Sequence, residues 1–209
     1  MSLAVLFRDS SLAVVDKPAG LAVDEDVLPL LARELAPPGG RAWPRVVHRL
    51  DRGTSGCLLV ALRKSAEEAL ARSFDEGAIE KTYLALVRGA PPDELQLDTP
   101  YGQDANDRRR FTTQLQTARR ARLRFVKVEQ LREAALLRIE LETGRTHQIR
   151  VQLSEAGFPV LGDETYGVPG ERLMLHAERL SFPHPQGGQR IACVSELPEA
   201  LRTALARLR

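Results

Sequence analysis

The sequence predicts an α+β fold in which a mixed, mostly antiparallel sheet is surrounded by helices and loops. Segments with the alternation typical of strands outnumber the helical segments, and the two kinds do not alternate strictly along the chain. A doubly wound parallel sheet requires that alternation, so we do not expect one. The chain has 209 residues, of which 43% are hydrophobic and 28% are charged. This length and composition predict a single globular domain over residues 1–209.

The N-terminal part of the chain contains two predicted strands followed by a short predicted helix. Residues 3–20 hold two apolar runs around a polar turn and end in the bend-forming sequence Lys-Pro-Ala-Gly. Residues 27–36 have helical periodicity, and the Pro and Gly residues at 37–40 would end that helix. The apolar run at 57–63 predicts a buried strand.

A helix is expected directly after this buried strand. Ser65 and Glu68 have the spacing of a capping box, and Gly77 suits the C-terminal end of the helix. Residues 81–89 then alternate as a strand does. The stretch 89–122 is rich in Pro, Gln, Asp and Arg and has the weakest core signal in the chain. We therefore expect a long surface excursion or a loop-rich insertion there.

The C-terminal half contains both strand and helix signals. Residues 122–129 and 134–141 are expected to pair as a hairpin. Residues 146–157 predict a helix that Gly157 ends. The remaining expected elements are strands at 172–182 and 190–194 and an amphipathic helix at 197–208.

Neither a signal peptide nor a membrane span is expected. The longest fully apolar stretch, at 57–62, is far shorter than the roughly 20 residues that a membrane helix needs. The two cysteines are Cys57 and Cys193, and both lie in apolar, strand-like runs. A disulfide between them has no support in the sequence, so we expect two buried thiols in a reducing cytoplasm.

Charge is segregated along the chain. The net charge is only +2, but residues 41–64 carry a local charge of +5 and residues 101–132 a local charge of +6. Two basic segments on an acidic body are the pattern of a protein that binds a polyanion. A solvated, arginine-rich surface is the alternative, and charge alone does not decide between the two.

The residue types of a hydrolase triad occur close together at His48, Asp51 and Ser55. Triad members usually come from separate segments, and the chain has no G-x-S-x-G elbow, so this pattern is weak. The histidines and cysteines also lack the spacings of a structural zinc site, and we expect no metal. From the residues alone, His147 and His176 are expected to be buried, hydrogen-bonded rings.

The setting of Asp51 is unusual, because it lies between Arg49 and Arg52 in a turn-forming segment. That segment is HRLDRGTSG, at residues 48–56. Further motifs follow in order: KTY at 81–83, VRG at 87–89, GRTHQIR at 144–150, LGDETYG at 161–167 and LMLHAERLSFPHP at 173–185. Together, from about residue 3 to residue 195, they resemble the RluA-type pseudouridine synthases.

The resemblance implies the pseudouridine synthase catalytic fold and an isomerase that converts uridine in RNA to pseudouridine without a cofactor. It assigns Asp51 as the carboxylate that acts at the anomeric carbon, either by attacking the sugar or by removing a proton from it. Both roles require the ionised form, which a nearby guanidinium favours. By the motif match this guanidinium belongs to Arg150. Tyr83 matches the family tyrosine that stacks on the uracil ring.

The resemblance also implies contacts with RNA, either ribosomal or transfer RNA. Arg49 matches the arginine that fills the space left when the target uridine flips out of its helix. The two basic segments would then contact the RNA backbone without reading its sequence. The other expected RNA contacts are Arg52, Arg145 and His147 in the motifs, and Arg108, Arg109 and Arg110 in the second basic segment. We expect a monomer by default.

The chain departs from the family pattern after its Lys-Pro-Ala-Gly bend. Many relatives have Val-His or Val-His-Pro there, whereas this chain has Val23, Asp24 and Glu25. It also starts directly at the expected catalytic domain, whereas some relatives carry a small RNA-binding module first. Two rival functions stay open: a non-catalytic RNA-binding or chaperone protein, and a hydrolase that uses Ser55 and His48. The joint presence of the aspartate, the tyrosine and the arginine favours the synthase.

Overall fold

The computed structural model describes residues 2–35, 44–116 and 119–209. The chain forms two compact units: Met1–Lys81 with Ala177–Glu196, and Thr82–His176 with Leu197–Arg209. The helix stop expected at 37–40 lies outside the described residues, as does Arg41. Each unit combines antiparallel strands with helices, in agreement with the predicted α+β class. The single domain expected over residues 1–209 stays a prediction.

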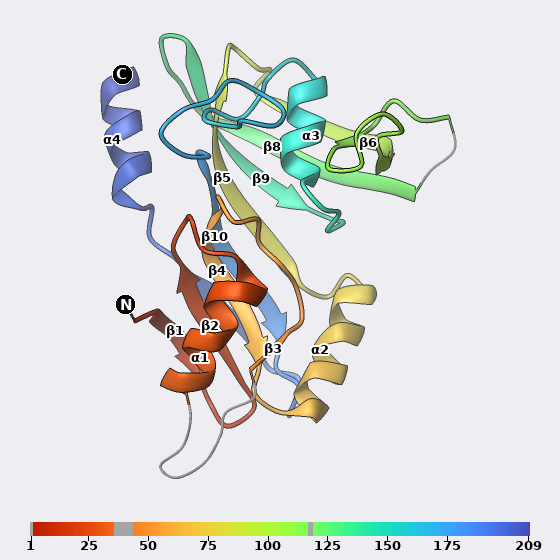
Figure 1. Cartoon of the computed structure of the whole chain (residues 1–209), viewed down its shortest axis with the longest axis vertical. Coiled ribbons are helices and arrows are strands. Elements are labelled where there is room, and N and C mark those ends of the chain that lie inside the picture. The colour runs from red at the N-terminus through yellow and green to blue at the C-terminus, as the bar shows by residue number, and fades with distance from the viewer. Residues whose placement is uncertain (1, 36–43, 117–118) are drawn as a thin grey trace. The chain divides into compact units, whose positions relative to one another are not determined.

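The first unit is a sheet built from N-terminal and C-terminal strands (Figure 1). Its strands are β1 (Ala4–Arg8), β2 (Leu12–Lys17), β3 (Arg45–Val46), β4 (Ser55–Ala61), β10 (Leu175–Pro183, which enters this unit at Ala177) and β11 (Arg190–Val194). The order is β1-β2-β4-β10, with β3 paired to β4 and β11 to β10. The strands predicted within 3–20 and at 57–63, 172–182 and 190–194 are confirmed.

Strand β4 is buried along its whole length. Since side chains alternate between the two faces of a sheet, burial of every residue means that both faces of β4 are covered. On one face Cys57 and Leu59 pack with Leu70 and Phe182 in a hydrophobic cluster. Cys57 and Cys193 are buried free thiols, as predicted.

The helix after β4 is confirmed, but its predicted cap is wrong. Helix α2 spans Lys64–Asp75, its N-cap is Arg63, and no side chain caps it. Ser65 therefore lies inside the first turn, where it cannot act as the N-cap, because the helix starts as soon as the chain has left β4. Gly77 follows the helix with φ +71°, as expected for a C-terminal glycine.

The segment after β2 contains a turn that the sequence did not predict. A π-helical turn, η1, spans Val23–Val27 and leads into helix α1 at Leu28–Glu34, which confirms the helix expected there. Val23 and Val27 are buried, whereas the acidic residues between them face outward. The buried valines fix the turn to the core and leave three consecutive acids, residues 24–26, on its outer side.

The second unit is built on a sheet with long strands. They are β5 (Glu80–Arg88, in this unit from Thr82), β6 (Glu94–Gln103), β7 (Phe111–Thr112), β8 (Arg119–Gln130) and β9 (Ala134–Leu141). The order is β5-β9-β8-β6-β7, and each neighbouring pair is antiparallel. The strand expected at 81–89 and the hairpin of 122–129 with 134–141 are confirmed.

The loop-rich insertion expected at 89–122 is only partly correct, because β6 and the start of β8 form 14 of these 34 residues. Strand β6 pairs with β8 from Glu94↔Val126 to Tyr101↔Arg119. Most residues of β6 are only partly buried or exposed, so the strand has little hydrophobic signal. Backbone pairing and cross-strand ion pairs hold it instead, which composition alone does not reveal.

Two helices complete the second unit. Helix α3 spans Gln148–Glu155, and helix α4 spans Glu199–Leu208, so both predicted helices are confirmed. The residue before α3, His147, has a left-handed backbone with φ 57°. Within the described parts of the chain, no helix is long and apolar enough to cross a membrane.

Candidate active site

Asp51 lies in the loop that leads from β3 into β4, and the backbone of this loop is fixed. The N–H of Thr54 donates to the Asp51 carbonyl at 3.0 Å. The next carbonyl, that of Arg52, accepts the N–H of Gly20 at 2.8 Å and the Lys17 ammonium at 3.2 Å. These bonds tie the aspartate loop to the Lys-Pro-Ala-Gly bend after β2.

Lys17 supplies the buried charge in this arrangement, since its side chain is inaccessible to solvent. Its ammonium also donates to the carbonyls of Pro18 at 2.9 Å and Leu21 at 2.8 Å. A buried ammonium needs such acceptors, and their positions fix those of both loops. From the sequence, this lysine was predicted only as part of a bend. Its buried role was missed, although a charged residue at the end of an apolar strand was a signal that could have indicated it.

His48 anchors the start of the same loop. Its Nε2 accepts the N–H of Leu59 at 2.9 Å, and its ring centroid lies 5.2 Å from that of Phe74. Burial, and next the charge of Lys81, lower the pKa of His48 to about 3. The ring is therefore neutral, and its Nε2 is already occupied. Because a hydrolase built on Ser55 would need this ring as its base, the hydrolase alternative loses its main support.

The two arginines beside Asp51 meet the acids of η1. Arg49 Nη2 lies 3.1 Å from Asp24 Oδ2, and Arg52 Nη2 lies 2.8 Å from Glu25 Oε2. The local charge of +5 over residues 41–64 is thus offset by acids from another segment.

In the second unit, Arg150 and Asp163 form a buried bidentate ion pair. Nε and Nη2 of Arg150 donate to the two carboxylate oxygens of Asp163, each at 2.8 Å. The two side chains are 10% and 0% exposed. Burial would raise the pKa of Asp163, but the hydrogen bond and charge of Arg150 and the N–H groups of Tyr166 and Thr165 hold this pKa below its usual value.

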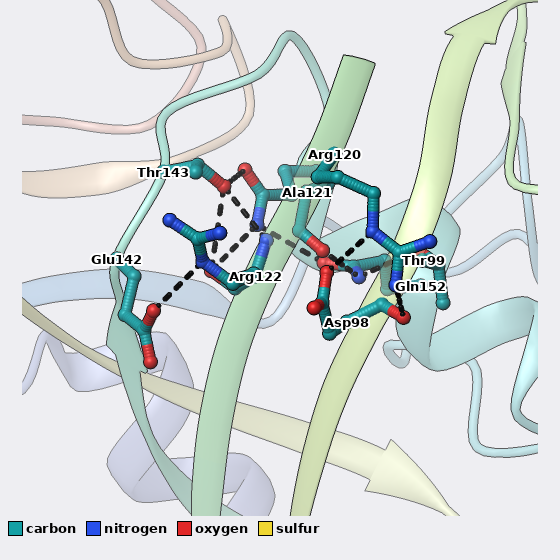
Figure 2. A network of polar contacts seen from close by, with 9 residues as sticks. Asp98, Thr99, Arg120, Ala121, Arg122, Glu142, Thr143 and Gln152 are labelled. Carbon is teal, nitrogen blue, oxygen red and sulfur yellow. Dashed lines mark hydrogen bonds and ion pairs between the residues drawn. The ribbon is translucent and has the colours of Figure 1, made fainter. Parts of the chain in front are cut away.

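Helix α3, which carries Arg150, is fastened to the sheet by two buried glutamines. Gln148 Nε2 donates to the Arg122 carbonyl at 3.0 Å and to Gln152 Oε1 at 3.0 Å. Gln152 Nε2 donates in turn to Thr99 Oγ1 at 2.9 Å and to the Ala121 carbonyl at 3.0 Å, as Figure 2 shows. Because these bonds join α3 to both β6 and β8, they fix the backbone from which Arg150 projects.

Aromatic side chains surround the N-terminal end of α3. His147 Nδ1 and Tyr166 Oη are 2.9 Å apart, and the Arg110 and Arg150 guanidinium groups lie 5.1 and 5.2 Å from the centre of the Tyr166 ring. His147 is hydrogen-bonded as predicted but only half-buried, whereas His176 is fully buried. The part played by Arg110 was not foreseen, because it depends on a loop folding back onto α3.

The other predicted residues of the second unit lie in separate places. Tyr83 is buried in β5 opposite Ile139 of β9. Arg145 is half-buried, and its backbone N–H donates to Gln148 at 3.0 Å. Arg108 and Arg109 are exposed, and Arg109 pairs with Asp107. Asp51 belongs to the first unit and Tyr83 and Arg150 to the second, so their joint action stays a proposal.

The second basic segment is also charge-compensated. Arg120 pairs with Asp98 across the β6–β8 ladder, and Arg122 pairs with Glu142, as can be followed in Figure 2. Arg124 pairs in the same way with Glu94. Among the described residues, no group of three or more His, Cys, Asp or Glu side chains could hold a metal ion.

The fold and the sequence match define the class of this protein. Residues 11–155 match the family model for RNA pseudouridylate synthase. The chain belongs to this family, whose members are isomerases that convert uridine in RNA to pseudouridine.

Individual relatives agree with this assignment. The chain is 38% identical to an uncharacterized RNA pseudouridine synthase of Chloroflexus aurantiacus, covering 92% of this chain and 65% of that protein. It is 34% identical to ribosomal large subunit pseudouridine synthase D of Zymomonas mobilis, covering 96% and 71%. Among solved structures, human RNA pseudouridylate synthase domain containing 1 matches with a TM-score of 0.81 and 27% identity, covering 100% of this chain and 95% of that one.

Proposed function

We propose that this protein isomerises specific uridines of structured RNA to pseudouridine, with Asp51 as the essential carboxylate and without a cofactor. The observation that carries the proposal is the Asp51 loop, which lies within the family match and whose backbone is held by Thr54, Gly20 and Lys17. A rigid loop of this kind suits a carboxylate that must react at one particular atom of a bound nucleotide. The two free buried thiols suit a reducing cytoplasm, which is the compartment we propose.

The reaction breaks the bond between N1 of uracil and the ribose, turns the base, and rejoins it through C5. No electrons are gained or lost: C5 loses its proton at the end and the freed N1 gains one, so that substrate and product are isomers. We assign Asp51 to the anomeric carbon in its ionised form, as attacking group or as base. We assign Arg150 as the cation that supports this carboxylate and Tyr83 as the ring that stacks on uracil. In this proposal Asp163 holds Nε and Nη2 of Arg150, so that the guanidinium can act only in one orientation.

Ribosomal RNA is the substrate class that we propose first, because several relatives are named as large ribosomal subunit synthases. The test is to map pseudouridines in total RNA from cells with and without the gene. We expect one or more sites in large-subunit ribosomal RNA to be lost with the gene and restored by its return. If pseudouridines are lost only from transfer RNA, transfer RNA is the substrate class instead. If no pseudouridine is lost from any RNA, the proposal is contradicted.

We assign RNA-backbone contacts to the loop that carries Arg108, Arg109 and Arg110, and to Arg52, Arg145 and His147 beside the motif residues. Changing the three loop arginines to Gln should weaken binding to target and non-target RNA alike, because phosphate contacts carry no sequence information. The slope of log affinity against log salt should flatten by roughly 0.7 for each phosphate of a single strand that the variant no longer neutralises. The turnover rate of the bound complex should barely change. Affinities measured at several salt concentrations check this.

A matched control removes the same charge elsewhere in the second unit. Arg202, Arg207 and Arg209 lie on or just after α4 and pair with Glu199, Glu171 and Glu129. Changing these three to Gln should leave the salt slope close to that of the wild type. If the slopes of both triple variants are parallel to the wild-type line, the loop does not bind RNA.

A further inference from the structure

We propose that Asp24 and Glu25 compete with RNA phosphates for Arg49 and Arg52 and so set how strongly an RNA must bind elsewhere on the protein. The two acids hold the arginines that flank Asp51, and RNA must displace them before it can use these arginines. This inference rests on the proposed role of Arg49 and Arg52 in RNA binding. It adds a function for the acidic turn η1, which the proposed reaction does not use.

The geometry pairs each flanking arginine with its own acid. Arg49 Nη2 is 3.1 Å from Asp24 Oδ2, and Arg52 Nη2 is 2.8 Å from Glu25 Oε2. Arg52 Nη1 also lies 3.4 Å from Asp26 Oδ2. Three consecutive acids of one turn thus meet both arginines of the aspartate loop.

The acids are held in place by the turn that carries them. Val23 and Val27 are buried at its two ends. Asp26 Oδ2 accepts the N–H of Ala22 at 2.7 Å, which closes the turn. Arg52 Nη1 is in addition 3.4 Å from the Gly20 carbonyl. Since the backbones of both loops are fixed, these ion pairs lose less side-chain and loop entropy than pairs between flexible segments.

The pairs are weak enough for RNA to exchange them. The side chains of Arg49 and Arg52 are 74% and 58% exposed, and those of Asp24 and Glu25 are 50% and 74% exposed. Exposed ion pairs of this kind change an equilibrium constant by a factor of roughly 1.5 to 5 each. A phosphate that approaches the arginines also meets the repulsion of the displaced carboxylates.

This competition favours RNA that binds at further places on the protein. An RNA that offers only phosphates binds the two arginines but breaks two ion pairs of the protein and approaches its acids. A target RNA offsets this cost through its flipped uridine and its contacts at other sites. The acids therefore lower the affinity for both kinds of RNA by a similar factor, so that only an RNA with further contacts stays bound at low protein concentration.

The test neutralises the two acids and leaves Asp26 in place, because Asp26 also closes the turn. The probes are an adenylate oligomer, which contains no uridine, and an unmodified transcript of large-subunit ribosomal RNA. Asp24→Asn/Glu25→Gln should raise affinity for the adenylate oligomer roughly two- to twentyfold at low salt. It should steepen the salt slope by up to about 1.4, which corresponds to two phosphate contacts on a single strand. Affinity for the transcript should rise by a similar factor, because this RNA must break the same two ion pairs.

The matched control is Glu80→Gln/Glu171→Gln, which changes the net charge equally. Glu80 pairs with Arg190 and Arg179, and Glu171 pairs with Arg207, all outside the two basic segments. This variant should bind the adenylate oligomer within about twofold of the wild type. Equal gains in affinity and slope for the two double variants would mean that only net charge matters, and would overturn the proposal.

A third variant separates this inference from the RNA role on which it rests. Arg49→Gln/Arg52→Gln should weaken binding to both probes. If it does so while Asp24→Asn/Glu25→Gln has no effect, the arginines bind RNA but the acids do not compete, and the inference is wrong. If the arginine variant binds as the wild type does, the RNA role of these two arginines fails first. Thermal unfolding of each variant verifies that the loops still fold.

Discussion

An Asp51→Asn variant is expected to lose pseudouridine formation, with a rate at least about 10³-fold below that of the wild type. The amide has the shape of the carboxylate but no charge, so it can neither attack the sugar nor take a proton from it. The loop itself should survive, because the bonds from Thr54, Gly20 and Lys17 go to backbone carbonyls and not to the Asp51 side chain. The backbone of the loop and the RNA affinity should therefore stay nearly unchanged.

The measurement is single-turnover conversion of a ribosomal RNA transcript by purified protein. Asp75→Asn is the control, because Asp75 is an exposed aspartate at the end of α2 that has no role in the proposed reaction. We expect this control to retain wild-type turnover. Clear residual activity of Asp51→Asn, in protein free of wild-type enzyme, would remove Asp51 from its central role.

Arg150→Lys is expected to reduce kcat strongly, by about 10²-fold, with only a modest effect on RNA binding. Lysine keeps the positive charge but loses the planar fork that holds Asp163 through two bonds of 2.8 Å. The charge would then lose the fixed orientation that the pair with Asp163 gives it. Asp163→Asn should destabilise the fold more, because it removes the carboxylate that holds two nitrogens of a buried guanidinium, and breaking such a buried pair typically costs about 3–5 kcal/mol of unfolding free energy.

The pH dependence of stability provides an independent measurement of this pair. The pKa of Asp163 is lowered below the ordinary value of 3.8, so the pair contributes fully to stability above about pH 3.8 and loses this contribution as the pH falls through the folded-state pKa. Asp163→Asn should therefore flatten the acid limb of the stability curve.

Leu137→Ala is the control for a purely structural effect. Leu137 is fully buried in β9 of the same unit, and its truncation should cost about 2–5 kcal/mol. This variant should keep kcat at temperatures where it is folded. If Arg150→Lys shows wild-type kcat, or if Leu137→Ala loses kcat equally, Arg150 has only a structural role.

The distribution of charge illustrates a limit of prediction from sequence. Local charges of +5 and +6 in two segments indicated basic surfaces. In the structure many of these arginines face acids from elsewhere in the chain, such as Arg49 with Asp24 and Arg120 with Asp98. A window along the sequence counts neighbours in the chain, whereas the electrostatic field depends on neighbours in space. The surplus that can meet RNA is therefore smaller than the sequence indicated.

The sequence by itself determined most elements of the fold and the family. Buried strands such as β4 follow from an uninterrupted apolar run, and amphipathic helices such as α4 follow from hydrophobic periodicity; both are local properties. Long motifs such as HRLDRGTSG keep their order and spacing, and the match over residues 11–155 agrees with the family that they indicated.

Only the tertiary structure decided those features of the protein that have no local signal in the sequence. Strand β6 was missed because it is held by its ladder with β8 and not by burial. The capping box failed because the path of the chain out of β4 sets where α2 begins. The ion pair of Arg150 and Asp163 joins residues that are 13 positions apart in the sequence. The hydrogen bond from Lys17 to the Arg52 carbonyl joins residues that are 35 positions apart. Such contacts form only when packing brings separate segments together, and their energies therefore depend on burial and distance, which no stretch of sequence contains.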